Sequence, residues 1–235
     1  MKSLGIIIAR KNSKRLKNKN ILRLGKLKLY EYPLIAAIKS EKFNKIIVST
    51  DDKKIISNYK KYIKFKNVFF EKRPSKFCTD KSKAIDTVNY YVSKNKKKYS
   101  KIALMLPTCP FRDYKDINMA FKKLDKKTTS VISVTKYSFP IQFAISLNKD
   151  IAKYFFKNSD LVSGKTRSQD KKDFFHPNGG IYLSWINKIK KNKNFFKGRV
   201  RCVVMDKKKS IDIDHKEDYQ LAKLRLNKFY NNFKI

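Results

Sequence analysis

Short apolar runs, separated by segments long enough to form helices, constrain the fold of this chain most. The first run, Leu4–Ala9, is rich in β-branched residues, which is typical of a strand buried on both faces of a parallel sheet. Similar runs recur at residues 45–50, 67–71, 101–106 and 129–135. Because helical patterns lie between them, the alternation predicts an α/β fold with a mostly parallel sheet.

The alternation of strand and helix stops at about Tyr137. Residues 137–175 contain short β-like pieces and no clear helix. Strand character returns at residues 179–185 and 201–205, and a last helix is expected over Lys216–Phe229. We therefore expect one α/β core, residues 1–136 and 176–235, with 137–175 as an excursion that reaches a second subunit.

The charge of the chain is extreme but widely spread. It has 235 residues, a formal net charge of +39, and 41% hydrophobic residues, enough for a sizeable core. A charge of this sign is typical of chains that bind nucleic acid, a membrane surface or a phosphorylated substrate. Because lysine occurs in almost every segment, we interpret it as a general compositional bias. Arginine is scarce, and only arginine presents a planar fork that matches phosphate or carboxylate, so arginines are better pointers to a site.

Several function classes are disfavoured by what the sequence lacks. No apolar stretch approaches the ~20 residues that a membrane span needs. The cysteines Cys78, Cys109 and Cys202 show neither metal spacing nor a disulfide framework, so we expect a cytoplasmic protein. An RNA-associated basic protein is an alternative, but the loop at residues 10–20 has no aromatic side chain on which bases could stack. We expect neither a nucleic-acid nor a membrane partner.

Ligands of open α/β sheets bind beyond the carboxyl ends of the strands. The segments at those ends are residues 10–20, 49–52, 73–80 and 107–112. These segments carry four short motifs, and three further motifs lie later in the chain. In order, these are ARKNSKRLKNKN (9–20), VSTDD (48–52), RP (73–74), PTCPFR (107–112), RSQD (167–170), PNGGIY (177–182) and SIDID (210–214).

This ordered set resembles the acylneuraminate cytidylyltransferases, the family that includes CMP-sialic, legionaminic and pseudaminic acid synthetases. The resemblance extends over residues 4–222. It implies a Rossmann-like sheet of the nucleotide-diphospho-sugar transferase type and a homodimer in which residues 137–175 form an arm. It also implies a reaction of CTP with a nine-carbon keto sugar acid, giving a CMP-sugar and pyrophosphate for cell-surface polysaccharide synthesis. A sugar nucleotidyltransferase or glycosyltransferase of related fold is the alternative within this architecture.

The resemblance implies a nucleotide site in the first half of the chain. Its members would be Arg10, Asn12, Ser13, Lys19, Asn20, Arg73, Ser82 and Thr108. Arg10 and Lys19 would flank the triphosphate, because transfer of a phosphoryl group needs positioning and charge neutralisation. Backbone N–H groups near Asn12 and Ser13 could add donors. We expect the other lysines of the loop, such as Lys14 and Lys17, to be solvated surface charges.

The SIDID motif is the candidate Mg²⁺ site. Asp212 and Asp214 are two positions apart, so on an extended segment they project to the same side. Two carboxylates on one side suit Mg²⁺, which combines a few carboxylates with phosphate oxygens. Ile211 and Ile213 would then face the core. The pattern alone is equally typical of a solvated strand end.

The resemblance also implies a sugar site, in which this chain departs from the family. Its members would be Thr108, Gln142, Arg167, His176, Asn178, Tyr182, Phe195 and Phe196. Arg167 would clamp the sugar carboxylate, since arginine can bind it bidentately. The aromatic residues would line the sugar's acyl groups, or else pack in the core. Leu106 stands where the family often has Gln, Cys109 where it often has Ser, and His176 where Arg is frequent, so the sequence does not name the sugar.

Overall fold

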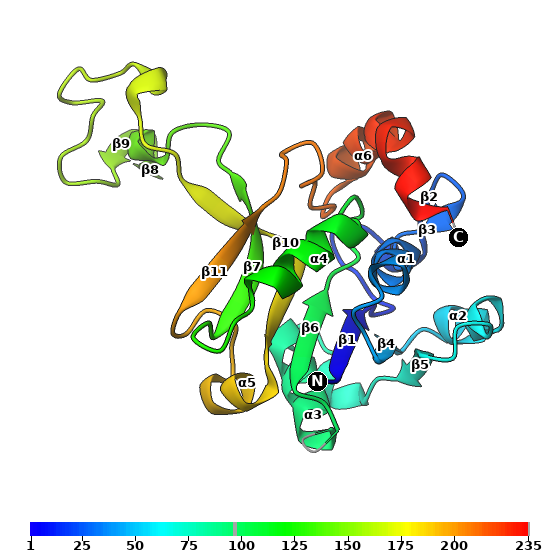
Figure 1. Cartoon of the computed structure of the whole chain (residues 1–235). Helices are drawn as coiled ribbons and strands as arrows, with labels where there is room; N and C mark the ends of the chain where they lie inside the picture. The colour runs from blue at the N-terminus through cyan, green and yellow to red at the C-terminus, as the bar shows by residue number, and fades with distance from the viewer. Residues whose placement is uncertain (96–97, 235) are drawn as a thin grey trace. The chain divides into compact units, whose positions relative to one another are not determined.

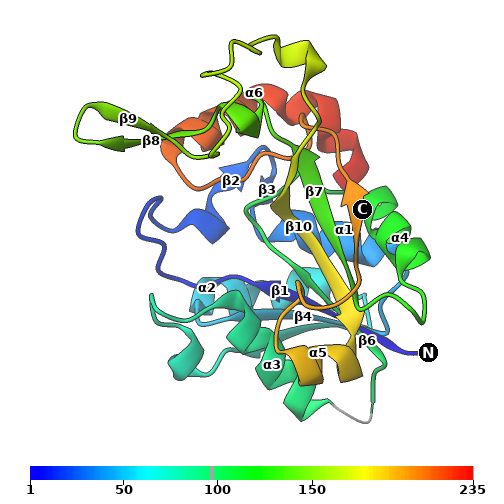
Figure 2. The same cartoon turned by 90° about the vertical axis from the view of Figure 1, so that its left-hand side faces the viewer.

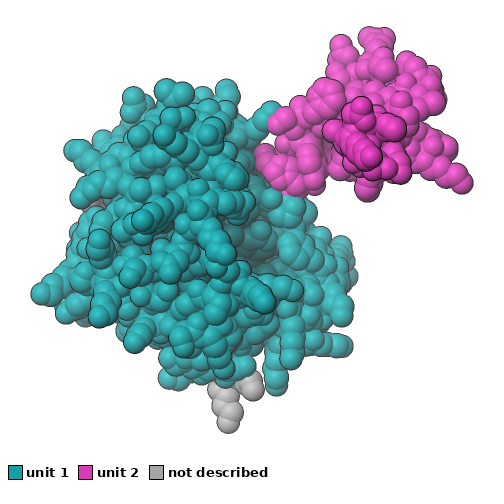
Figure 3. Space-filling model, turned by 180° about the vertical axis from the view of Figure 1, so that it is seen from behind, with its two compact units in different colours: residues 1–134, 177–235 teal, residues 135–176 magenta. Residues whose placement is uncertain are grey.

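The computed structural model describes residues 1–95 and 98–234. The chain forms two compact units (Figure 3). The larger unit contains residues 1–134 and 177–235, and the smaller one residues 135–176. No helix in the described part of the chain is long and apolar enough to cross a membrane.

A seven-stranded sheet forms the larger unit (Figure 1). Its strands are β1 (Ser3–Ile8), β4 (Lys45–Thr50), β5 (Val68–Lys72), β6 (Lys101–Met105), β7 (Ser130–Lys136), β10 (Phe175–Trp185) and β11 (Val200–Val204). Their spatial order is β11-β7-β10-β6-β1-β4-β5. Strand β1 runs parallel to β4 and β6, β4 to β5, and β11 to β7, whereas β10 is antiparallel to β6. The predicted α/β fold with a mostly parallel sheet is confirmed.

Helices cover both faces of this sheet (Figures 1 and 2). Helices α1 (Glu31–Ser40) and α4 (Tyr114–Lys123) contact each other on one face, where α6 (Lys216–Phe229) shares their apolar cluster. Helices α3 (Ala84–Lys94) and α5 (Ile186–Asn192) pack together on the other face. The short α2 (Lys53–Ile56) begins at Asp52, whose carboxylate accepts a hydrogen bond from the Lys54 N–H at 2.8 Å.

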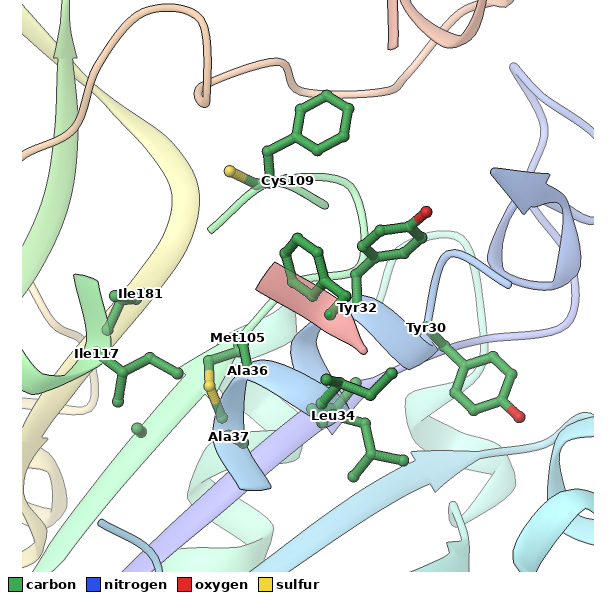
Figure 4. Packing of buried hydrophobic residues seen from close by; sticks show 14 of the residues in the cluster. Tyr30, Tyr32, Leu34, Ala36, Ala37, Met105, Cys109, Ile117 and Ile181 are labelled. Atoms are coloured by element: carbon green, nitrogen blue, oxygen red, sulfur yellow. The ribbon is translucent and has the colours of Figure 1, made fainter. Parts of the chain in front are cut away.

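The core strands are apolar because both of their faces are buried. In β6, Ala103 and Met105 pack into the cluster beneath α1, while Ile102 and Leu104 pack into the cluster beneath α3. Figure 4 shows Met105 beside Ala36 and Ala37 of α1. Small side chains at these two positions let the helix approach the sheet closely. The alternation between two apolar clusters explains why the sequence shows continuous apolar runs.

One pairing of short strands and one helix lie outside the sequence predictions. Strands β2 (Arg23–Leu24) and β3 (Leu27–Lys28) form a small hairpin, and α5 follows β10 directly. In the smaller unit, β8 (Ile145–Asn148) and β9 (Ile151–Tyr154) form an antiparallel hairpin that is exposed on all eight residues. This agrees with the expected short β-like pieces.

The segment that carries the SIDID motif is fastened to the start of α4. Asp113 caps α4 by accepting a hydrogen bond from the Lys115 N–H at 2.9 Å, and the Asp116 carboxylate accepts one from the Asp113 N–H at 3.0 Å. Lys209 lies against both carboxylates, 2.9 Å from Asp113. Burial lowers the pKa of Lys209, but the attraction of Asp116 outweighs it and raises the pKa, which favours the charged ammonium.

Gly180 marks a place where β10 tolerates no side chain. A Cβ at this position would lie 2.8 Å from Ser133 Oγ and 3.1 Å from Met205 Sδ. Ser133 is already fixed, because its hydroxyl accepts the Ile181 N–H at 2.7 Å. We expect Gly180→Ala to lower the free energy of unfolding by about 1–3 kcal/mol, as overpacking in cores does.

Urea denaturation of Gly180→Ala and of the surface variant Lys17→Ala measures this effect. The surface variant should stay within about 0.5 kcal/mol of the parent. Equal unfolding midpoints for the two variants would contradict the close packing at Gly180.

Candidate active site

A cavity of about 210 Å³ lies at the carboxyl ends of β1, β5 and β6. The loops that follow these strands, together with the start of α3, form its walls. It brings together most of the predicted nucleotide-binding residues, namely Arg10, Ser13, Lys19, Asn20, Arg73, Ser82 and Thr108. Asn12 is exposed and is not part of the lining. The parallel strand order therefore places the predicted residues around one hollow, at the sheet edge where such folds bind ligands.

Arg73 is the most unusual side chain of the cavity. Its residue is only 3% exposed, yet Nε and Nη2 have no hydrogen-bond partner. The Asp51 carboxylate lies 3.8 Å from Nη2, too far for a hydrogen bond, and it accepts the Lys11 N–H at 2.8 Å instead. Buried donors normally have hydrogen-bond partners. The unpaired guanidinium in this cavity wall can therefore donate to a ligand with acceptor atoms.

The first part of the basic loop is held by Asp80. Arg10 Nη1 lies 3.2 Å from one Asp80 carboxylate oxygen, and Lys14 Nζ lies 2.8 Å from the other. The hydrogen bond from Lys14, with the charge of Arg10, holds the pKa of Asp80 below its usual value. The Arg10 carbonyl in turn accepts the Asn20 amide at 2.8 Å. Lys14 lines the cavity, and its side chain is 75% exposed, as the predicted solvated charge would be.

The second part of the loop is held by Asp214. Lys19 is buried, and its ammonium donates to the Ile213 carbonyl at 2.8 Å and to Asp214 Oδ1 at 2.7 Å. Arg15 Nη2 lies 2.8 Å from Asp214 Oδ2. Lys19 and Arg15 both line the cavity, so Asp214 lies at its edge. Sequence reasoning singled out Lys19 and Asp214 but missed Arg15 and Asp80.

The SIDID segment alternates as expected. Ile211 and Ile213 are buried in the core, and Asp212 and Asp214 alternate with them along the chain. Protein atoms around the Asp212 carboxyl raise its pKa, a hydrogen bond from Thr108 opposes this, and the like charge of Asp214 raises the pKa further. The charges of the two carboxylates therefore interact, and Thr108, which donates a hydrogen bond to Asp212, lines the cavity.

The two carboxylates would not enclose a metal ion by themselves. Within residues 1–95 and 98–234, no group of three or more His, Cys, Asp or Glu side chains is arranged to hold one. Mg²⁺ is commonly bound by one or two carboxylates plus substrate phosphates. Asp212 and Asp214 fit that pattern, with the remaining ligands coming from a nucleotide.

Three aromatic residues predicted for the sugar site lie together in the structure. The ring centroid of Tyr182 lies 5.6 Å from that of Phe195 and 6.1 Å from that of Phe196. Burial raises the pKa of Tyr182, and the charge of Asp212 raises it further, which places the phenol near that carboxylate. Phe195 is buried, as a core residue would be, whereas Phe196 is 57% exposed and is available to a ligand.

Asn178 is built into the core. Its carbonyl oxygen accepts the Ser133 hydroxyl at 2.6 Å and the Gly180 N–H at 3.1 Å, and its amide donates to Ser210 at 2.9 Å. The side chain thus joins β7, β10 and the start of the SIDID segment. This geometry favours a positioning role over the predicted direct contact with sugar.

Leu106 and Cys109 are the two residues near the cavity that differ from the family pattern. Leu106 lies in the cavity wall, and Cys109 lies in the buried core. Leu106 lines the cavity itself, and the Gly179 backbone packs close to its side chain. Cys109 is fully buried, and burial raises the pKa of its thiol to about 12. A thiol with that pKa is almost entirely protonated at neutral pH, which agrees with an inert residue.

The remaining predicted sugar-site residues belong to the smaller unit. Gln142 donates to the Lys172 carbonyl at 3.0 Å, and the ring of His176 packs at a tilt against Tyr137, with 4.7 Å between centroids. Arg167 is 79% exposed and lies 3.6 Å from Asp170. Within this unit Arg167 is thus largely open to solvent.

Curated relatives carry the same activity class in their names. The chain is 34% identical over 223 residues to the N-acylneuraminate cytidylyltransferase of Escherichia coli, covering 94% of this chain and 51% of that protein. It is 27% identical to a pseudaminic acid cytidylyltransferase of Campylobacter jejuni, covering 95% and 96%. It is also 27% identical to the CMP-N,N'-diacetyllegionaminic acid synthase of Legionella pneumophila, covering 94% and 95%. The chain thus spans about half the length of the E. coli relative and nearly all of the other two.

Solved structures share the fold. A 4-diphosphocytidyl-2C-methyl-D-erythritol synthase from Anaerococcus prevotii superposes with a TM-score of 0.67 at 14% identity, over 96% of each chain. A CMP:2-keto-3-deoxy-manno-octonic acid synthetase in complex with CTP gives 0.67 at 13% identity, over 97% of this chain and 99% of that one. Residues 4–183 match the family model described as cytidylyltransferase, so the chain belongs to the cytidylyltransferase family.

Proposed function

We propose that this protein transfers CMP from CTP to a nonulosonic acid, a sugar acid of the sialic type. The anomeric hydroxyl of the sugar attacks the α-phosphorus of CTP, the bond to the β-phosphate oxygen breaks, and pyrophosphate leaves. The observation that carries the proposal is Arg73, a buried cation with two unpartnered nitrogens in the wall of the cavity. The names of the relatives support both the nucleotide and the class of sugar.

The basic loop supplies the charge that such a transfer needs. Arg10, Lys14, Arg15 and Lys19 all line the cavity. Arranged around a triphosphate, they would neutralise the charge that moves onto the leaving pyrophosphate. Their ion pairs with Asp80 and Asp214 keep them beside the cavity before a nucleotide binds.

Mg²⁺ is part of the proposal. Asp212 and Asp214 would hold it together with phosphate oxygens, and the ion would withdraw negative charge from the α-phosphate. The sugar would then lie on the side of Asp212 where Tyr182 and Phe196 meet. The exposed face of Phe196 suits the apolar parts of an acylated sugar.

The smaller unit supports a homodimer in which the partner completes the sugar site. Its surface carries an unusual set of exposed apolar side chains, namely Phe139, Ile145, Leu147, Ile151, Tyr154, Phe155, Phe156, Val162, Phe174 and Phe175. On the hairpin, Ile145 pairs with Tyr154 and Leu147 with Ala152, so one face is continuously apolar. Patches of this kind mark association sites. We propose a C₂ dimer, the commonest closed assembly, with Arg167 clamping the carboxylate of the sugar bound to the other subunit.

A nucleotide and sugar panel tests the reaction. With Mg²⁺ and a set of nonulosonic acids, pyrophosphate release should require CTP over ATP, GTP and UTP. Release should also require one of the sugar acids, because water would be a poor substitute for a positioned hydroxyl. Turnover with ATP equal to that with CTP, across all sugars, would refute the proposed activity.

Arg73→Gln tests the observation on which the proposal rests. Loss of charge-assisted hydrogen bonds to the nucleotide should weaken CTP binding by about 10- to 100-fold in calorimetry. The melting temperature without nucleotide should stay level or rise, since the variant removes an incompletely paired buried cation. Arg23→Gln is the control, because Arg23 is exposed and lies outside the cavity. If both variants bind CTP like the parent, Arg73 does not serve the nucleotide.

Subunit complementation tests the shared site. Arg167→Ala and Asp212→Ala should each be inactive alone. After equal mixing and subunit exchange, half of the dimers are mixed, and each has one intact site, so about a quarter of the parental activity should return. A monomer by light scattering, or no recovery after exchange is proven by mass spectrometry, would exclude a site shared between subunits.

A further inference from the structure

Asp214 has both of its carboxylate oxygens occupied by protein cations. Lys19 Nζ lies 2.7 Å from Oδ1, and Arg15 Nη2 lies 2.8 Å from Oδ2. The group of three therefore carries a net positive charge, and each oxygen already has a cationic partner. A divalent cation approaching Asp214 would meet repulsion from two positive groups at close range.

The two cations differ in how firmly they are placed. The Lys19 side chain is only 10% exposed and is anchored a second time on the Ile213 carbonyl. The Arg15 side chain is 60% exposed, and Asp214 is its one ion-pair partner among the described residues. Exposed pairs of this kind are weak and screened by salt. Arg15 is thus the cation that can leave.

The cavity offers Arg15 an alternative partner. Arg15 lines it together with Arg10 and Lys14 of the same loop. A triphosphate in the cavity carries several negative charges and fork-shaped pairs of acceptor oxygens, which match a guanidinium. When Arg15 turns to a phosphate, Asp214 Oδ2 is released, and the nucleotide also neutralises the positive charge around it.

We propose that Arg15 masks Asp214 until a triphosphate draws it away, so that the divalent metal binds at Asp212 and Asp214 with or after the nucleotide. Arg15 is a positioning residue in this scheme, since it acts on the metal through Asp214. The inference rests on the proposed function, which assigns Asp212 and Asp214 to the metal.

Mn²⁺ binding, followed as loss of the free-ion EPR signal, tests the mask without any turnover. In the absence of nucleotide, Arg15→Gln should bind Mn²⁺ roughly three- to tenfold more tightly than the parent. Lys17→Gln removes the same charge from an exposed position of the same loop and should bind like the parent. The double variant Arg15→Gln/Asp214→Asn should lose the gain, which assigns the effect to Asp214.

The same titration on protein saturated with CTP completes the test, with Asp214→Asn plus CTP as the blank for metal held by the nucleotide alone. The advantage of Arg15→Gln over the parent should then shrink, because the mask is already removed. If Arg15→Gln and Lys17→Gln bind Mn²⁺ alike without CTP, and both exceed Asp214→Asn, the mask is overturned while the metal site stands. If Asp214→Asn matches the parent with and without CTP, the metal site is overturned and the mask with it.

Discussion

The backbone hydrogen bond from the Ile213 N–H to the Thr108 carbonyl, 2.7 Å long, joins the two segments on which the site depends. One segment follows β6, and the other arrives more than a hundred residues later from the far edge of the sheet. Lys209 secures the later segment on α4, and Lys19 holds it from the other side through the Ile213 carbonyl. The Asp212–Asp214 pair is therefore placed by contacts from three separate parts of the chain.

The fold could be predicted because the sequence patterns that specify its strands and helices are local. The strands of the sheet centre are apolar on both faces, so they appear in the sequence as short apolar runs, and the helices between them follow from the alternation. Helix α5 escaped prediction because it is short and only Ile186 and Ile189 of its residues are buried. The hairpin β2–β3 has two residues in each strand, too few for a recognisable period.

Only the site residues that belong to recognisable sequence motifs could be predicted. Family resemblance and the scarcity of arginine pointed to residues such as Arg73. Asp80 and Arg15 were missed because their roles arise from ion pairs between residues far apart in the chain, 70 positions in the case of Asp80 and Arg10. The composition nevertheless contained a signal that could have identified Asp80. With 19 acidic residues against 58 basic ones, a carboxylate in a loop at a strand end is as informative here as an arginine.

The apolar hairpin face of the smaller unit acquires a further meaning in a chain with a net charge of +39. Two copies of such a chain repel one another at long range, while the hairpin faces attract only at contact. Repulsion of this kind keeps newly made chains dispersed, even though each carries a surface prone to aggregation. It also makes association sensitive to ionic strength, because salt shortens the range of the repulsion and leaves the apolar contact intact. The lysine-rich composition thereby acts as a colloidal stabiliser for a protein whose exposed hairpin would otherwise promote uncontrolled self-association.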